Sequence, residues 1–227
     1  MINKKIFIAG GILIASEIVW QLYKIFPNFR KTCVHESKRK ILEVMFFSIE
    51  SSLCRAHAAN DKMCHKENCP VRYIRKLVNY IDCAEKSLDV CIHMLTCQSL
   101  ANAIVNARKR GIAVRVILDR SKAVNDASQT AVFHSNGVVI RMPDLDVLMH
   151  HKFLIVDSEI LISGSTNWTM SAFFGNFENI VVTNHSSTVK PFVEEFERLW
   201  TLFEHPIPSE LEESLKRPVY NSPNNIL

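Results

Sequence analysis

The sequence lacks three features, and each absence limits what the protein can be. It has no strong charge of one sign, because 27 basic and 23 acidic residues leave a formal net charge of +4, which permits an anionic partner without requiring one. Its seven cysteines are an odd number spread through predicted helices and strands, a poor disulfide framework that favours a reducing compartment. No internal repeat is visible, and 227 residues with 48% hydrophobic composition suit one domain with a core rather than two.

An apolar run occupies residues 6–23, and these roughly 18 residues span about 27 Å as a helix. Basic residues are more frequent after this run than before it, so the positive-inside rule places the C-terminal bulk in the cytosol. We therefore expect residues 1–42 to be a single-pass membrane anchor with a basic linker. A cleaved signal peptide and a buried core helix are the alternatives.

Alternating apolar segments predict an α/β domain over residues 43–204, and the polar, proline-containing residues 205–227 predict a disordered tail. The βαβαβ order favours a mixed, mostly parallel sheet flanked by helices. Strands are predicted from about residue 45 and over 87–95, 112–118, 138–142, 147–157, 159–165 and 179–184; helices are predicted over 71–81, 98–110, 126–137, 166–174 and 189–203.

One strand–turn–strand segment carries a distinctive set of polar residues. His150 and Lys152 are two apart in a predicted strand, so their side chains share one face. Asp157 and Ser158 make the reversal that follows. The return strand then ends in a small, polar segment, which a hairpin would bring back beside the first pair: Gly164, Ser165 and Asn167.

This segment resembles the phospholipase D superfamily, whose pattern is H-x-K-x4-D followed by G-S/G-x-N. The matching residues are His150, Lys152, Asp157, Gly164, Ser165 and Asn167. The resemblance implies a phosphodiesterase in which a neutral imidazole attacks phosphorus and forms a phosphohistidine. Lys152, Asn167 and the Ser165 hydroxyl would supply donors to the phosphoryl oxygens, so no catalytic metal is implied.

A second imidazole, protonated, must deliver a proton to the leaving oxygen. Because the chain holds one such pattern and no repeat, we expect this imidazole to come from a twofold-related copy, so that a homodimer forms the site. The resemblance also implies that Glu178 orients the nucleophilic imidazole. By the same resemblance, Asp157 is expected to be a structural hydrogen-bonding partner rather than a proton carrier.

A cysteine- and histidine-rich insertion spans residues 54–69. Its spacings suit a structural zinc ion held by three thiolates and one imidazole, which would fold a segment with no core of its own. The expected ligands are Cys54, His57, Cys64 and Cys69; reduced, buried cysteines are the alternative. His65 is the other candidate for the imidazole ligand.

The single pattern, the anchor and the insertion together resemble one branch of the superfamily, the mitochondrial cardiolipin hydrolase or Zucchini endonuclease group. This resemblance implies an anchor in the mitochondrial outer membrane and a cytosolic dimer. It also implies cleavage of single-stranded RNA to make the 5′ ends of PIWI-interacting RNAs in the germline. Hydrolysis of cardiolipin to phosphatidic acid is the alternative, and a non-catalytic membrane adaptor is a third, disfavoured by the intact catalytic pattern.

An endoribonuclease needs a basic groove, whereas a lipase needs an apolar approach to its site. Outside residues 6–23 the sequence shows no exposed apolar run, which favours RNA over cardiolipin or another acidic phospholipid. The expected groove residues are Arg108, Lys109, Arg110, Lys122 and Arg141.

Overall fold

The computed structural model describes residues 40–59, 64–123, 129–143 and 147–204, all of which belong to the unit Ser37–Leu227. The expected anchor, residues 6–23, and the expected tail, residues 205–227, lie outside the described residues. Within the described ranges, no helix is both long and apolar enough to cross a membrane.

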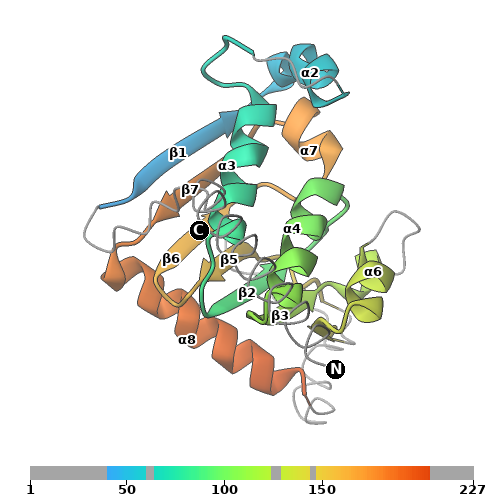
Figure 1. Ribbon diagram of the computed structural model, residues 1–227, viewed down its shortest axis with the longest axis vertical. Helices are drawn as coiled ribbons and strands as arrows, with labels where there is room; N and C mark the ends of the chain where they lie inside the picture. Colours follow the sequence, from blue (N-terminus) through green and yellow to red (C-terminus); the bar gives the residue numbers. More distant parts are fainter. Residues whose placement is uncertain (1–39, 60–63, 124–128, 144–146, 205–227) are drawn as a thin grey trace, which may run out of the picture. The chain divides into compact units, whose positions relative to one another are not determined.

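A seven-stranded mixed sheet forms the centre of the domain, in the order β1-β7-β6-β5-β2-β3-β4 (Figure 1). Parallel pairing is confined to β2, β3 and β4, and the remaining neighbours run antiparallel. The expectation of an α/β domain with a mixed sheet flanked by helices is confirmed, but antiparallel pairs outnumber parallel ones, so the sheet is not mostly parallel. The strands are β1 (Leu42–Phe47), β2 (Ser87–Ile92), β3 (Ala113–Leu118), β4 (Val139–Arg141), β5 (Lys152–Val156), β6 (Ile160–Gly164) and β7 (Glu178–Thr183).

The predicted reversal between β5 and β6 is confirmed. Asp157 and Ser158 have φ values of 54° and 59°, and the Glu159 N–H donates to the Val156 carbonyl at 2.9 Å. Two successive positive φ values are those of the hairpin turn that matches strand twist. Strand β5 itself begins at Lys152, later than predicted, because the Met149 N–H bonds a side chain rather than a neighbouring strand.

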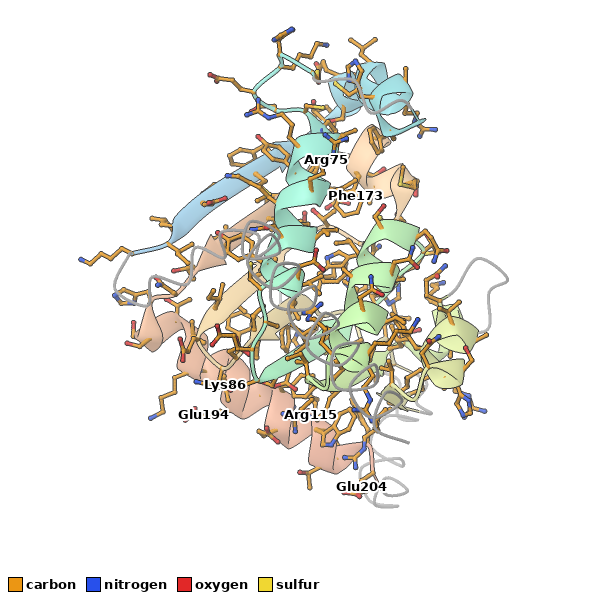
Figure 2. The ribbon with its side chains drawn as sticks, viewed as in Figure 1. Arg75, Lys86, Arg115, Phe173, Glu194 and Glu204 are labelled. Atoms are coloured by element: carbon orange, nitrogen blue, oxygen red, sulfur yellow. The ribbon has the colours of Figure 1, made fainter. Side chains whose placement is uncertain are left out.

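Helices cover both faces of the sheet. Helices α3 (Pro70–Asp82), α4 (Gln98–Lys109) and α7 (Met170–Gly175) contribute to the larger core on one face, where α3 and α4 lie side by side (Figure 1). Helix α8 (Ser186–Leu202) packs Val189, Phe196 and Leu199 against the other face. In Figure 2, Arg115 of β3 lies beside α8, where its guanidinium bonds Glu197 at 2.6 Å.

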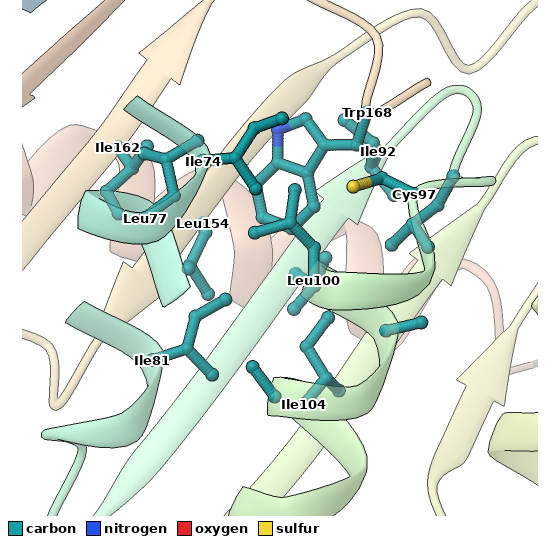
Figure 3. Packing of buried hydrophobic residues seen from close by; sticks show 14 of the residues in the cluster. Ile74, Leu77, Ile81, Ile92, Cys97, Leu100, Ile104, Leu154, Ile162 and Trp168 are labelled. Atoms are coloured by element: carbon teal, nitrogen blue, oxygen red, sulfur yellow. The ribbon is translucent and has the colours of Figure 1, made fainter. Parts of the chain in front are cut away.

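The larger core extends under the end of β2. Trp168 is buried among Ile74, Cys97 and Leu100 (Figure 3). The backbone N–H of Trp168 donates to the Met94 carbonyl at 3.0 Å, and the backbone carbonyl of Trp168 accepts from the Cys97 N–H at 2.9 Å. The segment that follows β6 is therefore fastened to the segment that follows β2.

The remaining short elements are the 3-10 helix η2 (Ile49–Cys54), α2 (Arg55–Ala59), α5 (Arg120–Ala123) and α6 (Thr130–Ser135). The predicted strand from residue 45 gives way to η2, which leads into the insertion, because the Ser51 N–H donates to the Ser48 carbonyl at 3.0 Å. Among the described residues, five cysteines are free thiols. Cys83 is disulfide-bonded, which departs from the expectation of reduced cysteines.

Candidate active site

Strand directions gather several polar side chains at one end of the sheet, which we call the site end. It consists of the carboxyl ends of β2, β3 and β6 and the amino ends of β5 and β7. Ile92 at the end of β2 pairs with Lys152 at the start of β5, and Gly164 at the end of β6 pairs with Ile180 near the start of β7. Residues just beyond these positions therefore lie at the same end.

His150 and Lys152 are in contact at this end. The Lys152 Nζ lies 3.1 Å from His150 Nδ1 and 3.2 Å from Nε2, and it donates to the His150 carbonyl at 2.8 Å. Lys152 is only 8% exposed, whereas the His150 side chain is exposed. Burial lowers the pKa of the Lys152 ammonium, and the carboxylate of Glu178 opposes this shift.

His151 points away from this pair. Its ring contacts Phe153 at a centroid distance of 5.7 Å, and its Nε2 lies 3.7 Å from a Glu195 carboxylate oxygen on α8. An exposed imidazole and a largely buried ammonium thus share one face of the segment, and the neighbouring histidine packs on the other.

Two site residues were not singled out from the sequence. His93 follows β2 and Asp119 follows β3. The His93 ring lies 4.6 Å from the His150 ring, and His93 Nδ1 lies 3.7 Å from an Asp119 carboxylate oxygen. The signal that could have found them is a polar residue placed directly after each of two buried parallel strands, since the carboxyl ends of such strands meet.

Ser165, Asn167 and Glu178 form the other side of the site end. The Ser165 hydroxyl donates to Glu178, which also accepts from the Asn176 amide at 3.1 Å. The Oδ1 of Asn167 is buried and has no hydrogen-bond partner in the described part of the chain. Within the described part of one subunit, the carboxylate of Glu178 makes no hydrogen bond to His150, so its expected orienting role stays a prediction.

The last residue of β6, Gly164, has to be small. A Cβ atom at this position would lie 2.0 Å from the Asn179 carbonyl oxygen, far inside van der Waals contact. The backbone of Ser165 bonds the same carbonyl at 3.1 Å, and the Ser165 hydroxyl accepts from the Asn179 N–H at 3.1 Å. Glycine is required here because β6 and the start of β7 approach closely.

Asp157 lies at the far end of β5, about 17 Å from the site end at 3.3 Å per residue. Its buried carboxylate accepts the backbone N–H groups of Glu85, Lys86 and Ser87, at 3.0, 2.6 and 2.8 Å. The side chain therefore fastens the segment that enters β2 to the β5–β6 turn.

The expected groove residues are not brought together. Helix α4 ends with Arg108 and Lys109 just before β3 begins at Ala113, so Arg108, Lys109 and Arg110 lie at the opposite end of the sheet from His150. Their place in the sequence does not show this, because strand direction decides which end of the sheet a helix terminus reaches.

The other two expected groove residues lie at the site end. Lys122 belongs to α5, which begins directly after Asp119. Arg141 ends β4, where its guanidinium lies 4.2 Å from the Trp200 ring centroid and 3.0 Å from a Glu204 carboxylate oxygen. Most of the charge of Arg141 is therefore already engaged within the subunit.

The insertion brings four candidate metal ligands together. The ligand atoms of Cys54, His57, Cys64 and Cys69 all lie within 4.8 Å of one another, and the Cys54 and Cys64 sulfurs are 4.0 Å apart. A tetrahedral zinc site requires sulfurs about 3.8 Å apart. Within the described ranges, the Nδ1 of His57 is buried without a hydrogen-bond partner, and His65 is exposed. These four residues can hold a metal ion, with His57 as the imidazole.

Strand β1 carries exposed apolar side chains that the sequence pattern did not predict. Leu42, Val44 and Phe46 alternate along the strand on one face, and Phe46 is 64% exposed. Phe177, directly before β7, is 76% exposed. We call these four residues the apolar strip. The expectation of no exposed apolar run outside residues 6–23 is therefore wrong, because alternation on an edge strand hides such a run.

Comparison with known proteins identifies the family. The family model described as "Cardiolipin synthase, PLD-like domain" matches residues 77–200. The "Mitochondrial cardiolipin hydrolase" of Drosophila melanogaster is 31% identical over 228 residues, covering 87% of this chain and 88% of that protein. The chain belongs to the phospholipase D superfamily.

A second relative and two solved structures extend the comparison. The relative of the same name from Homo sapiens is 37% identical over 139 residues, covering 61% of this chain and 54% of that protein. Nuc from Salmonella typhimurium, titled a phospholipase D family member, has a TM-score of 0.57 at 25% identity, covering 72% of this chain and 95% of that chain. NucT from Helicobacter pylori shares the fold, with a TM-score of 0.58 at 20% identity, covering 72% of this chain and 97% of that chain.

As a phospholipase D superfamily member, the chain is a hydrolase that acts on phosphodiesters. The site end offers the groups that such a reaction needs. These are an exposed imidazole, an ammonium in contact with it, and a hydroxyl and an amide on the neighbouring strand end.

Proposed function

We propose that the protein is a homodimeric phosphodiesterase that works through a phosphohistidine on His150. In the first step, a ring nitrogen of His150 attacks phosphorus and the bond from phosphorus to the leaving oxygen breaks. The protonated imidazole of His150 of the partner subunit gives its proton to that oxygen. In the second step, water attacks the phosphohistidine, and the same partner imidazole takes the proton of the water. The products are an alcohol and a phosphate monoester.

The contact between Lys152 Nζ and the His150 ring, at 3.1 Å, is the observation that carries this proposal. It places a positive charge where phosphoryl oxygens would lie when His150 is bonded to phosphorus. Lys152 is held there because its Nζ also donates to the His150 carbonyl. The amide of Asn167, whose Oδ1 has no partner among the described residues, and the Ser165 hydroxyl would be the further polar groups around the phosphoryl group.

The dimer is supported by the count of catalytic patterns. One H-x-K-x4-D pattern occurs in 227 residues, whereas the two steps need two imidazoles with opposite protonation states. A twofold axis beside the site end would bring the two copies of His150 together. The apolar strip runs along β1, whose last residue pairs with Glu178 at the site end, and a second copy of this chain is one surface that would cover it.

We propose single-stranded RNA as the substrate. The support is the resemblance to the Zucchini endonuclease group, together with the net charge of +4 and two basic residues in α5, Arg120 and Lys122, directly after Asp119. Cleavage would generate 5′ ends of PIWI-interacting RNAs. The third possibility, a non-catalytic membrane adaptor, would be excluded by any His150-dependent turnover.

Cardiolipin is the second candidate substrate, and two observations favour it. Relatives at 28% to 37% identity are named mitochondrial cardiolipin hydrolase, and the apolar strip ends near the site end. An apolar surface beside the scissile phosphodiester would allow the enzyme to approach a bilayer. The two substrates use the same catalytic residues, so only direct comparison separates them.

We also propose a structural zinc ion in the insertion and an anchor at residues 6–23 that places the domain on the cytosolic side of the mitochondrial outer membrane. When bound, zinc would hold η2, α2 and the start of α3 together through Cys54, His57, Cys64 and Cys69. Carbonate extraction of mitochondria and protease treatment of intact organelles test the anchor. We expect the full chain to stay in the membrane pellet and its C-terminal domain to be digested from outside.

The substrate test uses purified full-length protein with end-labelled single-stranded RNA and, separately, with phosphatidylcholine vesicles that contain cardiolipin. We expect RNA to be cleaved by the wild type and by His134→Asn, an exposed histidine of α6, but not by His150→Asn. Intact RNA together with His150-dependent release of phosphatidic acid would refute the RNA proposal and establish the second candidate.

The dimer test co-expresses wild-type and His150→Asn subunits in equal amounts with different tags. If each reaction needs His150 from both subunits, only the wild-type homodimer turns over, and activity falls to about one quarter of the wild-type value at equal total protein. Independent sites would give about one half. A value near one half would therefore refute the shared site, and unchanged activity in His150→Asn alone would refute the nucleophile.

A further inference from the structure

His93 and Asp119 lie outside the H-x-K-x4-D pattern, yet they contact the residues on either side of His150, the proposed nucleophile. Both are buried, and both lie at the site end. The backbone of His150 runs between them, because Met149 and His151 are bonded to one residue each.

The backbone contacts fix the segment from both sides. The Met149 N–H donates to an Asp119 carboxylate oxygen at 2.9 Å, and the His93 N–H donates to the His151 carbonyl at 2.9 Å. Asp119 is itself held, since its other carboxylate oxygen accepts from the Ser121 N–H at 3.0 Å and from the Ser121 hydroxyl. His150 therefore sits between two anchored peptide groups.

The ring contact fixes the side chain. The His93 and His150 rings lie 4.6 Å apart at an angle of 59°, and Lys152 Nζ approaches the His150 ring as well. His93 is 6% exposed, and its Nδ1 is buried with no hydrogen-bond partner among the described residues. A buried unpaired polar atom costs about 1 to 3 kcal/mol. The His93 side chain also makes a hydrogen bond to the backbone of Met149, the residue before His150, and a phenylalanine could not make this contact.

We infer that His93, backed by Asp119, is a positioning residue that holds the ring of His150 for attack and makes turnover depend on a second proton. This inference rests on the proposed function, because it assigns a role relative to His150 as nucleophile. Asp119 positions the backbone of His150, and the neutral ring of His93 positions its imidazole.

The charges that face His93 set the sign of the proton effect. Burial lowers the pKa of the His93 imidazole from its ordinary value of 6.5; Asp119 opposes this shift, and His150 and Lys152 lower the pKa further. His93 is therefore neutral at neutral pH. When it takes a proton, its ring gains an attraction to the Asp119 carboxylate and a repulsion from Lys152, both of which draw it off the face of His150.

Protonation of His93 weakens the support of the His150 ring. We therefore expect log kcat/KM of the wild type to fall more steeply on the acid side of the pH profile than that of a variant without the His93 imidazole. The lowered pKa also means that stability contributed by neutral His93 is present above pH 6.5 and is lost as pH falls below this value.

The test compares full-length wild type, His93→Ala, His93→Phe, Asp119→Asn and the control His134→Phe on bis(p-nitrophenyl) phosphate from pH 4.5 to 9. Rates are divided by the folded fraction at each pH from circular dichroism. For His93→Ala we expect kcat to fall tenfold or more with KM within twofold of wild type, since misplaced reacting groups lose rate rather than binding. His93→Phe should recover most of kcat at pH 8 and show a shallower fall of log kcat/KM toward acid pH than the wild type.

The results for His93→Ala and for His150→Asn test the positioning role and the proposed function separately. A kcat for His93→Ala within twofold of wild type, with a pH profile of the same shape on the acid side, would overturn the inference. An equally steep acid side of the profile in the wild type and in His93→Phe would overturn it as well. His150→Asn is measured in parallel: if it retains turnover, the proposed function fails, whereas an inactive His150→Asn beside a fully active His93→Ala refutes the positioning role alone.

Discussion

Asp157 is the one residue of the H-x-K-x4-D pattern that lies far from the site end, and replacing it should separate folding from chemistry. Its buried carboxylate accepts three backbone N–H groups, from Glu85, Lys86 and Ser87. Asparagine keeps one carbonyl oxygen and tolerates the positive φ of 54°, so Asp157→Asn removes charge and acceptor capacity without breaking the turn.

The magnitude follows from the hydrogen bonds that are lost. A hydrogen bond to a charged group contributes about 1.5 to 3 kcal/mol, and the asparagine retains part of this set. We expect Asp157→Asn to lower the free energy of unfolding by about 2 to 4 kcal/mol. A typical domain has about 5 to 15 kcal/mol in total, so the variant should still fold at low temperature.

Urea unfolding followed by circular dichroism measures the loss, and kcat is measured at low temperature and divided by the folded fraction. We expect kcat per folded molecule to stay within threefold of wild type. The matched control is Glu159→Gln, which breaks only the exposed contact between Glu159 and Lys86 and should cost less than about 1 kcal/mol. Lost turnover with unchanged stability would refute the reasoning and make Asp157 a participant in the chemistry.

Three further outcomes are expected. Gly164→Ala should abolish turnover and lower the melting temperature, because its Cβ would lie 2.0 Å from the Asn179 carbonyl oxygen; an active, stable variant would contradict the close approach. Ser158→Gly should raise the free energy of unfolding by about 0.5 to 1 kcal/mol in urea titrations, since glycine relieves the positive φ of 59°; a loss would contradict this. Chelation by EDTA should lower the melting temperature of the wild type but not of a Cys54→Ser variant, while kcat at low temperature stays unchanged; equal melting of both would argue against a metal in the insertion.

Local spacing in the sequence was enough to predict the hairpin and the pair at its start. His150 and Lys152 are two residues apart, and their side chains are in contact. The turn at Asp157 and Ser158 was visible as two short polar residues between apolar segments. Each of these features depends on neighbours along the chain, so strand periodicity and turn chemistry are sufficient to place it.

His93 and Asp119 could not be found in this way, because their contacts depend on the order of strands in the sheet. β2 lies between β3 and β5, and only this order brings residues 93, 119 and 150 to one place. The same reason explains why Arg108, Lys109 and Arg110 lie at the other end of the sheet from the site end. Basic side chains at the end of a helix look alike in the sequence, whichever end of the sheet they reach.

The antiparallel pairing of β2 with β5 makes catalytic activity depend on the register of these two strands. Ile92 must oppose Lys152 for the His93 N–H to reach the His151 carbonyl. A slip of two residues would preserve the inward and outward faces of both strands, and most of the buried surface with them, yet carry His150 about 7 Å away from its supports. Molecules with such a shifted register would look compact and helical in spectroscopy and be catalytically silent, so specific activity measures the fraction of chains in which these two strands are correctly aligned.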